Sequence, residues 1–203
     1  DLLSWSETNL RTFPWRDRER SIYEVFVAEF FLTQTPAENV DRNYEAFLRE
    51  YPGLGAIDDA SVGELERRIE PLGFQRIRAE ALDSIASDYE ELPRRSADLQ
   101  DLPRVGPYVA NATLCIADER PLAILDRNVN RVYERVFGSQ YPDGRPERVE
   151  FAESLLPEAS DEVRRYNLAL LDFGASLCHK RDPRCNQCFA SQYCSYFRSN
   201  GGS

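Results

Sequence analysis

The chain has 203 residues, which is enough for one large domain or two small ones with a hydrophobic core. A hydrophobic content of 42% excludes intrinsic disorder. No apolar run approaches the ~20 residues that span a bilayer, so we expect no membrane association. The net charge is −10, yet Lys180 is the single lysine among 25 basic residues. Many carboxylates with almost no lysine are typical of proteins adapted to high salt. The net charge therefore indicates a saline solvent and says little about the ligand. An acidic protein that never binds DNA stays an alternative at this point.

The apolar residues are spaced as in helices along almost the whole chain, and no stretch alternates as a strand would. A Gly/Pro-rich stretch at 138–146 marks the expected boundary between domains. Short connections join roughly nine or ten expected helices, so we predict an all-α fold. The clearest helices are expected at 22–35, 38–51, 61–72, 82–89, 107–117, 129–137, 149–156 and 163–177.

The stretch from 99 to 136 carries the strongest functional pattern. A tight turn at 102–107 leads into a helix that starts at Pro107, and Gly106 can adopt the backbone angles of such a turn. The N–H groups of a turn and a helix start point the same way, which suits a phosphate. One carboxylate, Asp126, then precedes another helix. Taken alone, Asp126 is better explained as the N-cap of that helix than as a catalytic residue.

Four cysteines lie within seventeen residues near the end of the chain, at Cys178, Cys185, Cys188 and Cys194. Such dense thiolates can hold a soft metal centre, and the spacing alone is balanced between a structural zinc and a [4Fe–4S] cluster. The fifth, Cys115, is expected in the core. The loop after Cys178 is the most basic short stretch of the chain, and its Lys180 and Arg181 are candidates to bind phosphates.

Together these patterns make the chain resemble the helix–hairpin–helix DNA glycosylases that carry an iron–sulfur cluster, the family of endonuclease III. Residues 102–106 are similar to the family hairpin and residues 125–132 to its catalytic-aspartate segment, while the cysteine spacing matches its [4Fe–4S] loop. Near the start, 13–16 and 27–35 are similar to the adenine glycosylase and archaeal mismatch thymine glycosylase branches. The matches occur in the family's order and cover essentially the whole chain.

The resemblance implies two all-α lobes. One is a six-helix barrel at 21–136 with the helix–hairpin–helix at about 96–118; the other, the iron–sulfur domain, combines 1–20 and 137–203. It also implies a [4Fe–4S] cofactor on the four cysteines. Double-stranded DNA with a mismatched or damaged base is the implied partner. We further expect a monomer that works at the nucleoid, in the cytoplasm of a prokaryote such as a high-salt archaeon.

The resemblance also assigns chemistry. Breaking an N-glycosidic bond builds positive charge on the sugar, which Asp126 would stabilise. Glu29 lies in an apolar segment, where burial would raise its pKa as a proton donor to the leaving base requires. An exposed or arginine-paired acid is the alternative for Glu29. Family members that also cut the backbone place a nucleophilic lysine where this chain has Tyr108. The expected enzyme is therefore a monofunctional glycosylase that leaves an abasic site.

The substrate is expected to be thymine or uracil opposite guanine, because the segments 166–173 and 194–197 are similar to the archaeal thymine enzymes and the chain stops soon after the cysteines. Adenine opposite 8-oxoguanine or guanine is the alternative, and a non-catalytic iron–sulfur DNA-binding protein is the alternative of another class. Arg104 replaces the first hairpin glycine, so the turn must tolerate a side chain or bend differently. The remaining expected DNA contacts are Arg104, Val105, Gly106, Gln34, Thr35 and Gln75.

Overall fold

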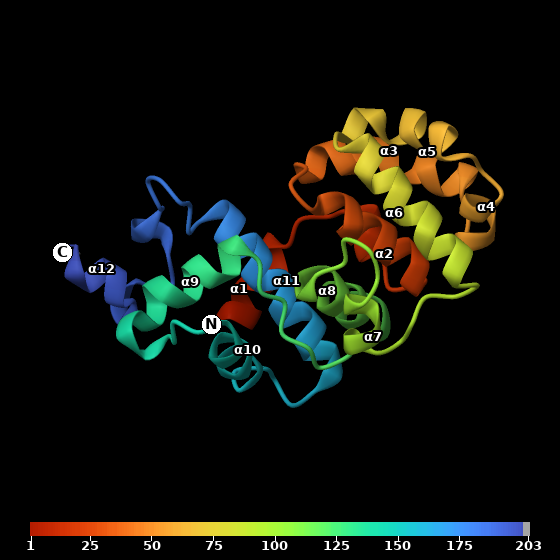
Figure 1. Cartoon of the computed structure of the whole chain (residues 1–203). Coiled ribbons are helices and arrows are strands. Elements are labelled where there is room, and N and C mark those ends of the chain that lie inside the picture. The colour runs from red at the N-terminus through yellow and green to blue at the C-terminus, as the bar shows by residue number, and fades with distance from the viewer. Residues whose placement is uncertain (201–203) are drawn as a thin grey trace. The chain divides into compact units, whose positions relative to one another are not determined.

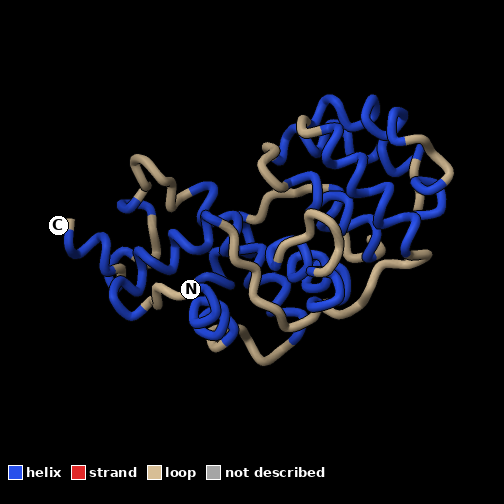
Figure 2. The backbone as a smooth tube through the Cα atoms, viewed as in Figure 1, coloured by secondary structure: helices blue, strands red, loops and turns tan. Residues whose placement is uncertain are grey.

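The computed structural model describes residues 1–200 and confirms the all-α prediction, with no strand among the described residues (Figures 1 and 2). The chain forms two compact units. One is the continuous segment 12–118, and the other joins the first eleven residues to the segment that begins at Glu119. No helix in the described part of the chain is both long enough and apolar enough to cross a membrane.

The 12–118 unit holds seven α-helices and two 3₁₀ turns. They are η1 (Pro14–Arg16), α2 (Ile22–Leu32), α3 (Ala37–Glu50), α4 (Leu54–Asp58), α5 (Val62–Ile69), η2 (Glu70–Leu72), α6 (Gln75–Asp88), α7 (Ser96–Gln100) and α8 (Pro107–Asp118). The sequence analysis missed the short helix α4, because a single turn shows too little of the 3.6-residue period, whereas α7 is the first helix of the helix–hairpin–helix expected at about 96–118.

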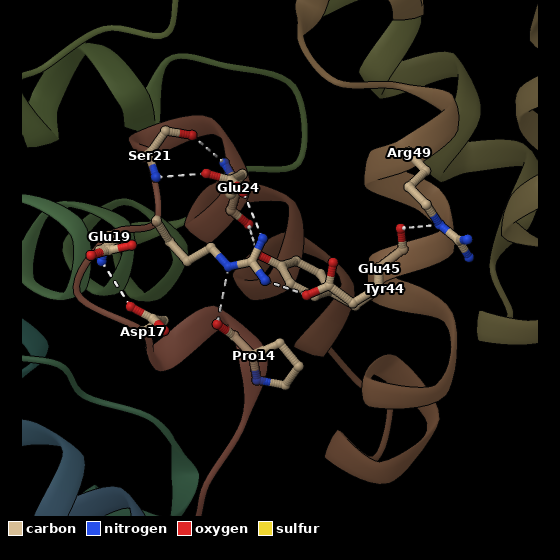
Figure 3. A network of polar contacts seen from close by, with 9 residues as sticks. Pro14, Asp17, Glu19, Ser21, Glu24, Tyr44, Glu45 and Arg49 are labelled. Carbon is tan, nitrogen blue, oxygen red and sulfur yellow. Dashed lines mark hydrogen bonds and ion pairs between the residues drawn. The ribbon is translucent and has the colours of Figure 1, made fainter.

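Helix α2 is the centre of this unit. It is apolar on every side, as expected for a helix enclosed by others, and it packs against α3 and α8. A capping box starts it: the Ser21 hydroxyl accepts from the Glu24 backbone N–H, and the Glu24 carboxylate accepts from the Ser21 backbone N–H. Arg20 donates to the same carboxylate, to Glu45 of α3 and to the Pro14 carbonyl, which ties the 3₁₀ turn and α3 to the start of α2 (Figure 3).

The second unit is discontinuous in sequence. It contains α1 (Leu2–Asn9), α9 (Arg127–Phe137), η3 (Gly138–Gln140), α10 (Arg145–Glu153), α11 (Ser160–Ser176), η4 (Cys185–Gln187), η5 (Ser191–Tyr193) and α12 (Ser195–Ser199). Helix α1 packs on α11. Arg11, which follows α1, donates from its backbone N–H and its side chain to Asp172 at 2.8 and 2.7 Å. The Asp172 side chain is fully buried, so this ion pair joins the first residues of the chain to α11 inside the unit.

The observed units divide the chain at different places from those predicted. Residues 119–136 were assigned to the barrel, but the amphipathic helix α9 buries Val129, Val132 and Tyr133 and packs on α11 and α12. Residues 12–20 fall in the other unit, because Trp15 is 1% exposed and meets the Tyr44 ring edge to face. The chain does not divide at the Gly/Pro-rich stretch 138–146, which forms turns inside one unit.

Candidate active site and cysteine centre

Glu29 and Tyr108 meet inside the 12–118 unit. Glu29 lies on α2 and is 2% exposed, while Tyr108 is the second residue of α8 and half-buried. The two helices pack together, and the Tyr108 hydroxyl donates to Glu29 Oε2 at 2.7 Å. The sequence analysis named both residues but predicted no contact between them. A buried carboxyl group with a phenolic partner is suited to proton transfer.

The hairpin before α8 keeps a tight turn despite the loss of its first glycine. Arg104 takes the left-handed conformation itself, with φ +64°, and its side chain is exposed. The Val105 N–H donates to the Leu102 carbonyl at 3.1 Å, and Val105 is buried. The sequence analysis assigned the special backbone angles of the turn to Gly106. Gly106 does not have positive φ, and the left-handed residue of the turn is Arg104. The turn therefore tolerates a side chain that points into solvent.

Asp126 is the N-cap of α9. Its Oδ1 accepts from the Val129 N–H at 2.6 Å, and its Oδ2 accepts from the Asn128 side-chain amide at 2.9 Å. The carboxylate is half-buried in the discontinuous unit. The structure therefore confirms that Asp126 is the N-cap of α9. The same two hydrogen bonds fix the orientation of its carboxylate, which an electrostatic role requires.

Arg131 links the Asp126 loop to the cysteine segment. It donates to Asn128 Oδ1 at 2.9 Å, to the Gly174 carbonyl at 2.8 Å and to the Cys178 carbonyl at 2.9 Å. Gly174 permits a close approach here, since a Cβ on it would lie 2.9 Å from the Asn128 Cβ. The sequence analysis gave Arg131 and Gly174 no role, because the Gly174 and Cys178 carbonyls lie more than forty residues from Arg131 along the chain.

All four cysteines of the C-terminal group line one pocket, together with Arg135 of α9 and Tyr196 of α12. None forms a disulfide. Burial raises the pKa of the Cys185 and Cys188 thiols, and the neighbouring cysteines add to the shift. No three potential ligands in residues 1–200 lie close enough to hold a single ion. Four thiols lining one pocket are donors of the type that a soft-metal centre takes, whether a zinc ion or an iron–sulfur cluster.

One arginine, Arg135, donates hydrogen bonds to the backbone of the basic loop after Cys178. Arg135 donates to the carbonyls of His179 at 2.6 Å and Lys180 at 3.1 Å, and to Cys178 Sγ at 3.4 Å. The Lys180 and Arg181 side chains are exposed. Both are accessible to solvent, and their binding of phosphates stays a prediction.

Three polar residues expected to contact DNA lie on two segments of the 12–118 unit, and their exposure differs. Gln34 is exposed with φ +62°, and Gln75 is half-buried. Thr35 is 8% exposed, and its hydroxyl donates to the Leu72 carbonyl at 3.0 Å, so it supports the segments from inside. Phe74, which the sequence analysis passed over, is 51% exposed with φ +51°. An exposed aromatic side chain next to Gln75 can stack on a nucleic-acid base.

Comparison with known proteins identifies the family. Residues 27–158 match the family described as HhH-GPD superfamily base excision DNA repair protein. A thymine/uracil-DNA glycosylase of Methanothermobacter thermautotrophicus is 34% identical over 97% of this chain and 91% of its own length. An adenine DNA glycosylase of Mycolicibacterium smegmatis is also 34% identical, over 93% of this chain and 66% of its own length.

Solved structures agree with this match. A thermostable thymine-DNA glycosylase superposes with a TM-score of 0.91 at 33% identity, covering 98% of this chain and 94% of the other. Endonuclease III trapped as a covalent intermediate with DNA superposes with a TM-score of 0.85 at 20% identity, a likeness in fold. On the family match, the sequence identity to relatives of similar length and the fold together, this chain belongs to the HhH-GPD superfamily of base excision DNA repair proteins.

Proposed function

We propose that this protein is a monofunctional DNA glycosylase that removes thymine or uracil opposite guanine and leaves an abasic site. The observation that carries the proposal is the hydrogen bond from Tyr108 to the buried Glu29. Glu29 supplies a carboxyl group for acid catalysis. Tyr108 places a phenol at the position where a lyase would need an amine. The single lysine of the chain, Lys180, lies in the other unit, on the basic loop.

In this mechanism the bond between the base and C1′ of the sugar breaks, and the electron pair leaves with the base. Glu29 gives its proton to the departing base, and the fixed Asp126 carboxylate stabilises the positive charge that develops on the sugar. A water molecule then adds to C1′ and gives its proton to the Glu29 carboxylate, which restores the acid for the next turnover. Because Tyr108 forms no Schiff base, nothing remains covalently attached and the DNA backbone stays intact.

We also propose a [4Fe–4S] cluster in the cysteine-lined pocket, ligated by Cys178, Cys185, Cys188 and Cys194. The thiol donors and their shared pocket support it. When bound, the cluster would cross-link the segment 178–194. The chain's own Arg135 holds the carbonyl groups of the loop that displays Lys180.

The partner in this proposal is duplex DNA with a mismatched base, bound by a monomer. Arg104 and the N–H group of the turn at Gly106 contact phosphates, as do Lys180 and Arg181, whereas the buried Val105, whose N–H donates to the Leu102 carbonyl, maintains the turn. Gln34 and Gln75 contact the duplex where the target base is extruded, which a mismatch makes less costly. The acidic, lysine-poor composition supports placing the protein beside the chromosome in the cytoplasm of a prokaryote that grows at high salt.

Single-turnover base excision tests the proposal. Duplexes with G·T, G·U, A·8-oxoguanine and A·G pairs are incubated with the protein in high potassium chloride, and strand breaks are read with and without alkali. Breaks at G·T or G·U only after alkali support it. Reaction at the adenine pairs alone would make the protein an adenine glycosylase, and breaks without alkali would contradict the role of Tyr108.

Asp126→Asn separates an enzyme from a DNA-binding protein that has no activity. The variant should lose turnover yet bind DNA as the wild type does. If the wild type binds every duplex and cleaves none, the non-catalytic alternative holds. Iron and sulfide analysis with the absorbance near 400 nm distinguishes the cluster from zinc.

A further inference from the structure

Arg78 of α6 is a buried charge with an unusual set of partners. Its residue is 3% exposed, and within residues 1–200 no carboxylate pairs with it. Burying a guanidinium is costly unless its N–H groups are satisfied by other dipoles. Here the acceptors are all carbonyl and hydroxyl oxygens. The burial of Arg78 could not be predicted from the sequence. Arg78 occupies the same helical face as Leu82 and Ile85, where an apolar side chain is expected.

The acceptors lie on two separate segments, 31–35 and 72–73. On the first, Arg78 Nη2 donates to the carbonyls of Phe31 at 3.0 Å and Thr33 at 2.6 Å, and to Thr35 Oγ1 at 2.9 Å. On the second, Nη1 donates to the carbonyls of Leu72 at 3.0 Å and Gly73 at 2.9 Å. One guanidinium therefore bridges the end of α2 and the turn before α6.

Both segments place residues in the left-handed conformation. Gln34 lies between two of the Arg78 acceptors and has φ +62°, while Gly73 has φ +76° and Phe74 φ +51°. Left-handed backbone at residues other than glycine persists where the surroundings hold it. The Arg78 guanidinium also lies 5.6 Å from the centre of the Phe74 ring, whose outer side is exposed. Gln34 and Phe74, whose backbone conformation Arg78 helps to hold, are also exposed at the surface.

We propose that Arg78 is a positioning residue, whose guanidinium sets the spacing and backbone geometry of segments 31–35 and 72–74 so that Gln34 and Phe74 enter the duplex together at the extruded base. This inference rests on the proposed function. Gln34 and Phe74 carry the contact with DNA, and Arg78 acts only through them. The Thr35 hydroxyl, which donates to the Leu72 carbonyl, is a second and weaker bridge between the same segments.

Arg78→Lys is the test, because it keeps the positive charge while an ammonium group with three N–H bonds cannot satisfy five acceptors in this fork geometry. Affinity is measured for a matched duplex and for a G·T duplex with a non-cleavable 2′-fluoro-thymidine. The fluorescence of 2-aminopurine beside the thymine reports base extrusion. We expect matched-duplex affinity to change little, the preference for the mismatch to fall about tenfold, and the extrusion signal to drop.

Arg76→Lys on the exposed face of α6 is the matched control, since Arg76 pairs only with Glu80 among the described residues, and it should keep the mismatch preference. Thr35→Val removes one acceptor and the second bridge at nearly constant volume, so it should shift the preference in the same direction by less. A purely structural role would lower the melting temperature and leave the preference of the folded protein unchanged.

Wild-type preference in folded Arg78→Lys would overturn the inference, and if that variant does not fold, unchanged preference in Thr35→Val would do so. Failure of the proposed function looks different. The wild type itself would then show no preference for any mismatch, and the inference would fall with it.

Discussion

The carboxyl group of Glu29 accepts a hydrogen bond from the Tyr108 hydroxyl at 2.7 Å. We expect Glu29→Gln to lower the single-turnover excision rate by about 10²–10⁴, the usual contribution of a positioned acid. Tyr108→Phe removes only the hydrogen bond and should cost roughly tenfold. Binding of a non-cleavable duplex serves as the control and should be unchanged in both variants. Equal rates in Glu29→Gln and wild type would exclude Glu29 as the acid.

Arg104 is the second residue whose environment leads to a prediction, because it holds the left-handed position of the hairpin with φ +64°. That conformation costs about 1–2 kcal/mol for a residue with a Cβ, and the greater freedom of glycine in the unfolded chain offsets about 0.4–1 kcal/mol of it. Arg104→Gly should therefore raise the free energy of unfolding by up to about 1.6 kcal/mol, measured in urea.

The same substitution removes a charge that we assign to a phosphate. The slope of log Kd against log salt for duplex DNA should become shallower by about one unit. Gly106→Ala is the matched control. A Cβ on Gly106 meets nothing within 4 Å and φ is not positive, so the salt slope should not change, and stability should rise only by about 0.4–1 kcal/mol, which comes from the reduced freedom of the unfolded chain. A less stable Arg104→Gly protein would contradict this account of the turn.

At the scale of elements, the contact between α11 and the Asp126 loop is the tightest near the site. A Cβ on Gly174 would lie 2.9 Å from the Asn128 Cβ and 3.2 Å from its backbone carbonyl. We expect Gly174→Ala to cost about 1–3 kcal/mol of stability through overpacking. It should also lower excision, because the loop that carries Asp126 must move.

The control for Gly174→Ala is the same change in α5. A Cβ on Gly63 would approach only the Arg67 guanidinium, at 4.0 Å, so Gly63→Ala should be neutral or slightly stabilising. Urea unfolding and excision rates measured on both variants check the prediction. If the two substitutions have equal effects, the close approach at Gly174 does not constrain the loop.

The network at the start of α2 ties stability to pH. Burial works against ionisation of Glu24, but the hydrogen bonds from the Ser21 backbone and Arg20 outweigh it and lower the pKa of Glu24 below its ordinary 4.5. Because the folded-state pKa is the lower one, the network stabilises the fold above pH 4.5, and this stabilisation is lost as the pH falls further.

Glu24→Gln should therefore destabilise the protein at pH 7 and differ less from the wild type at acid pH, in urea unfolding at each pH. Glu91→Gln, an exposed glutamate outside the network, is the control and should show no such dependence. A destabilisation by Glu24→Gln that is the same at both pH values would mean that packing, and not the charge of Glu24, matters there.

At the scale of the whole molecule, 35 acidic residues against 25 basic ones leave a net charge of −10. Repulsion among like charges disfavours the compact state, and salt shortens its range from about 10 Å at 0.1 M to about 3 Å at 1 M. We expect the melting temperature to rise with potassium chloride over this range. Sorbitol at equal osmolality should raise it less, and no effect of the salt would argue against adaptation to a saline cell.

Local patterns in the sequence determined much of this protein. Helical spacing predicted α2, α3, α6, α8, α9 and α11, and the helix expected at 61–72 contains α5, whose N-cap is Ser61. The motif order indicated the family, which the comparisons confirm. Each helical pattern and each motif is contained in a short run of neighbouring residues, and the order of the motifs is given by the sequence itself, so both features can be identified without knowledge of the fold. The roles given to the site residues stay predictions for experiment.

Only the tertiary structure decided the contacts that cross long stretches of chain. The meeting of Glu29 with Tyr108 spans 79 residues, and that of Arg11 with Asp172 spans 161. The unit boundary near Glu119 and the buried fork of Arg78 also arise from packing. A side chain's partners depend on which helices pack together, and the spacing of residues within one helix does not specify its neighbours. The residue types proposed for the chemistry could therefore be identified from the sequence, whereas the contacts between them could not.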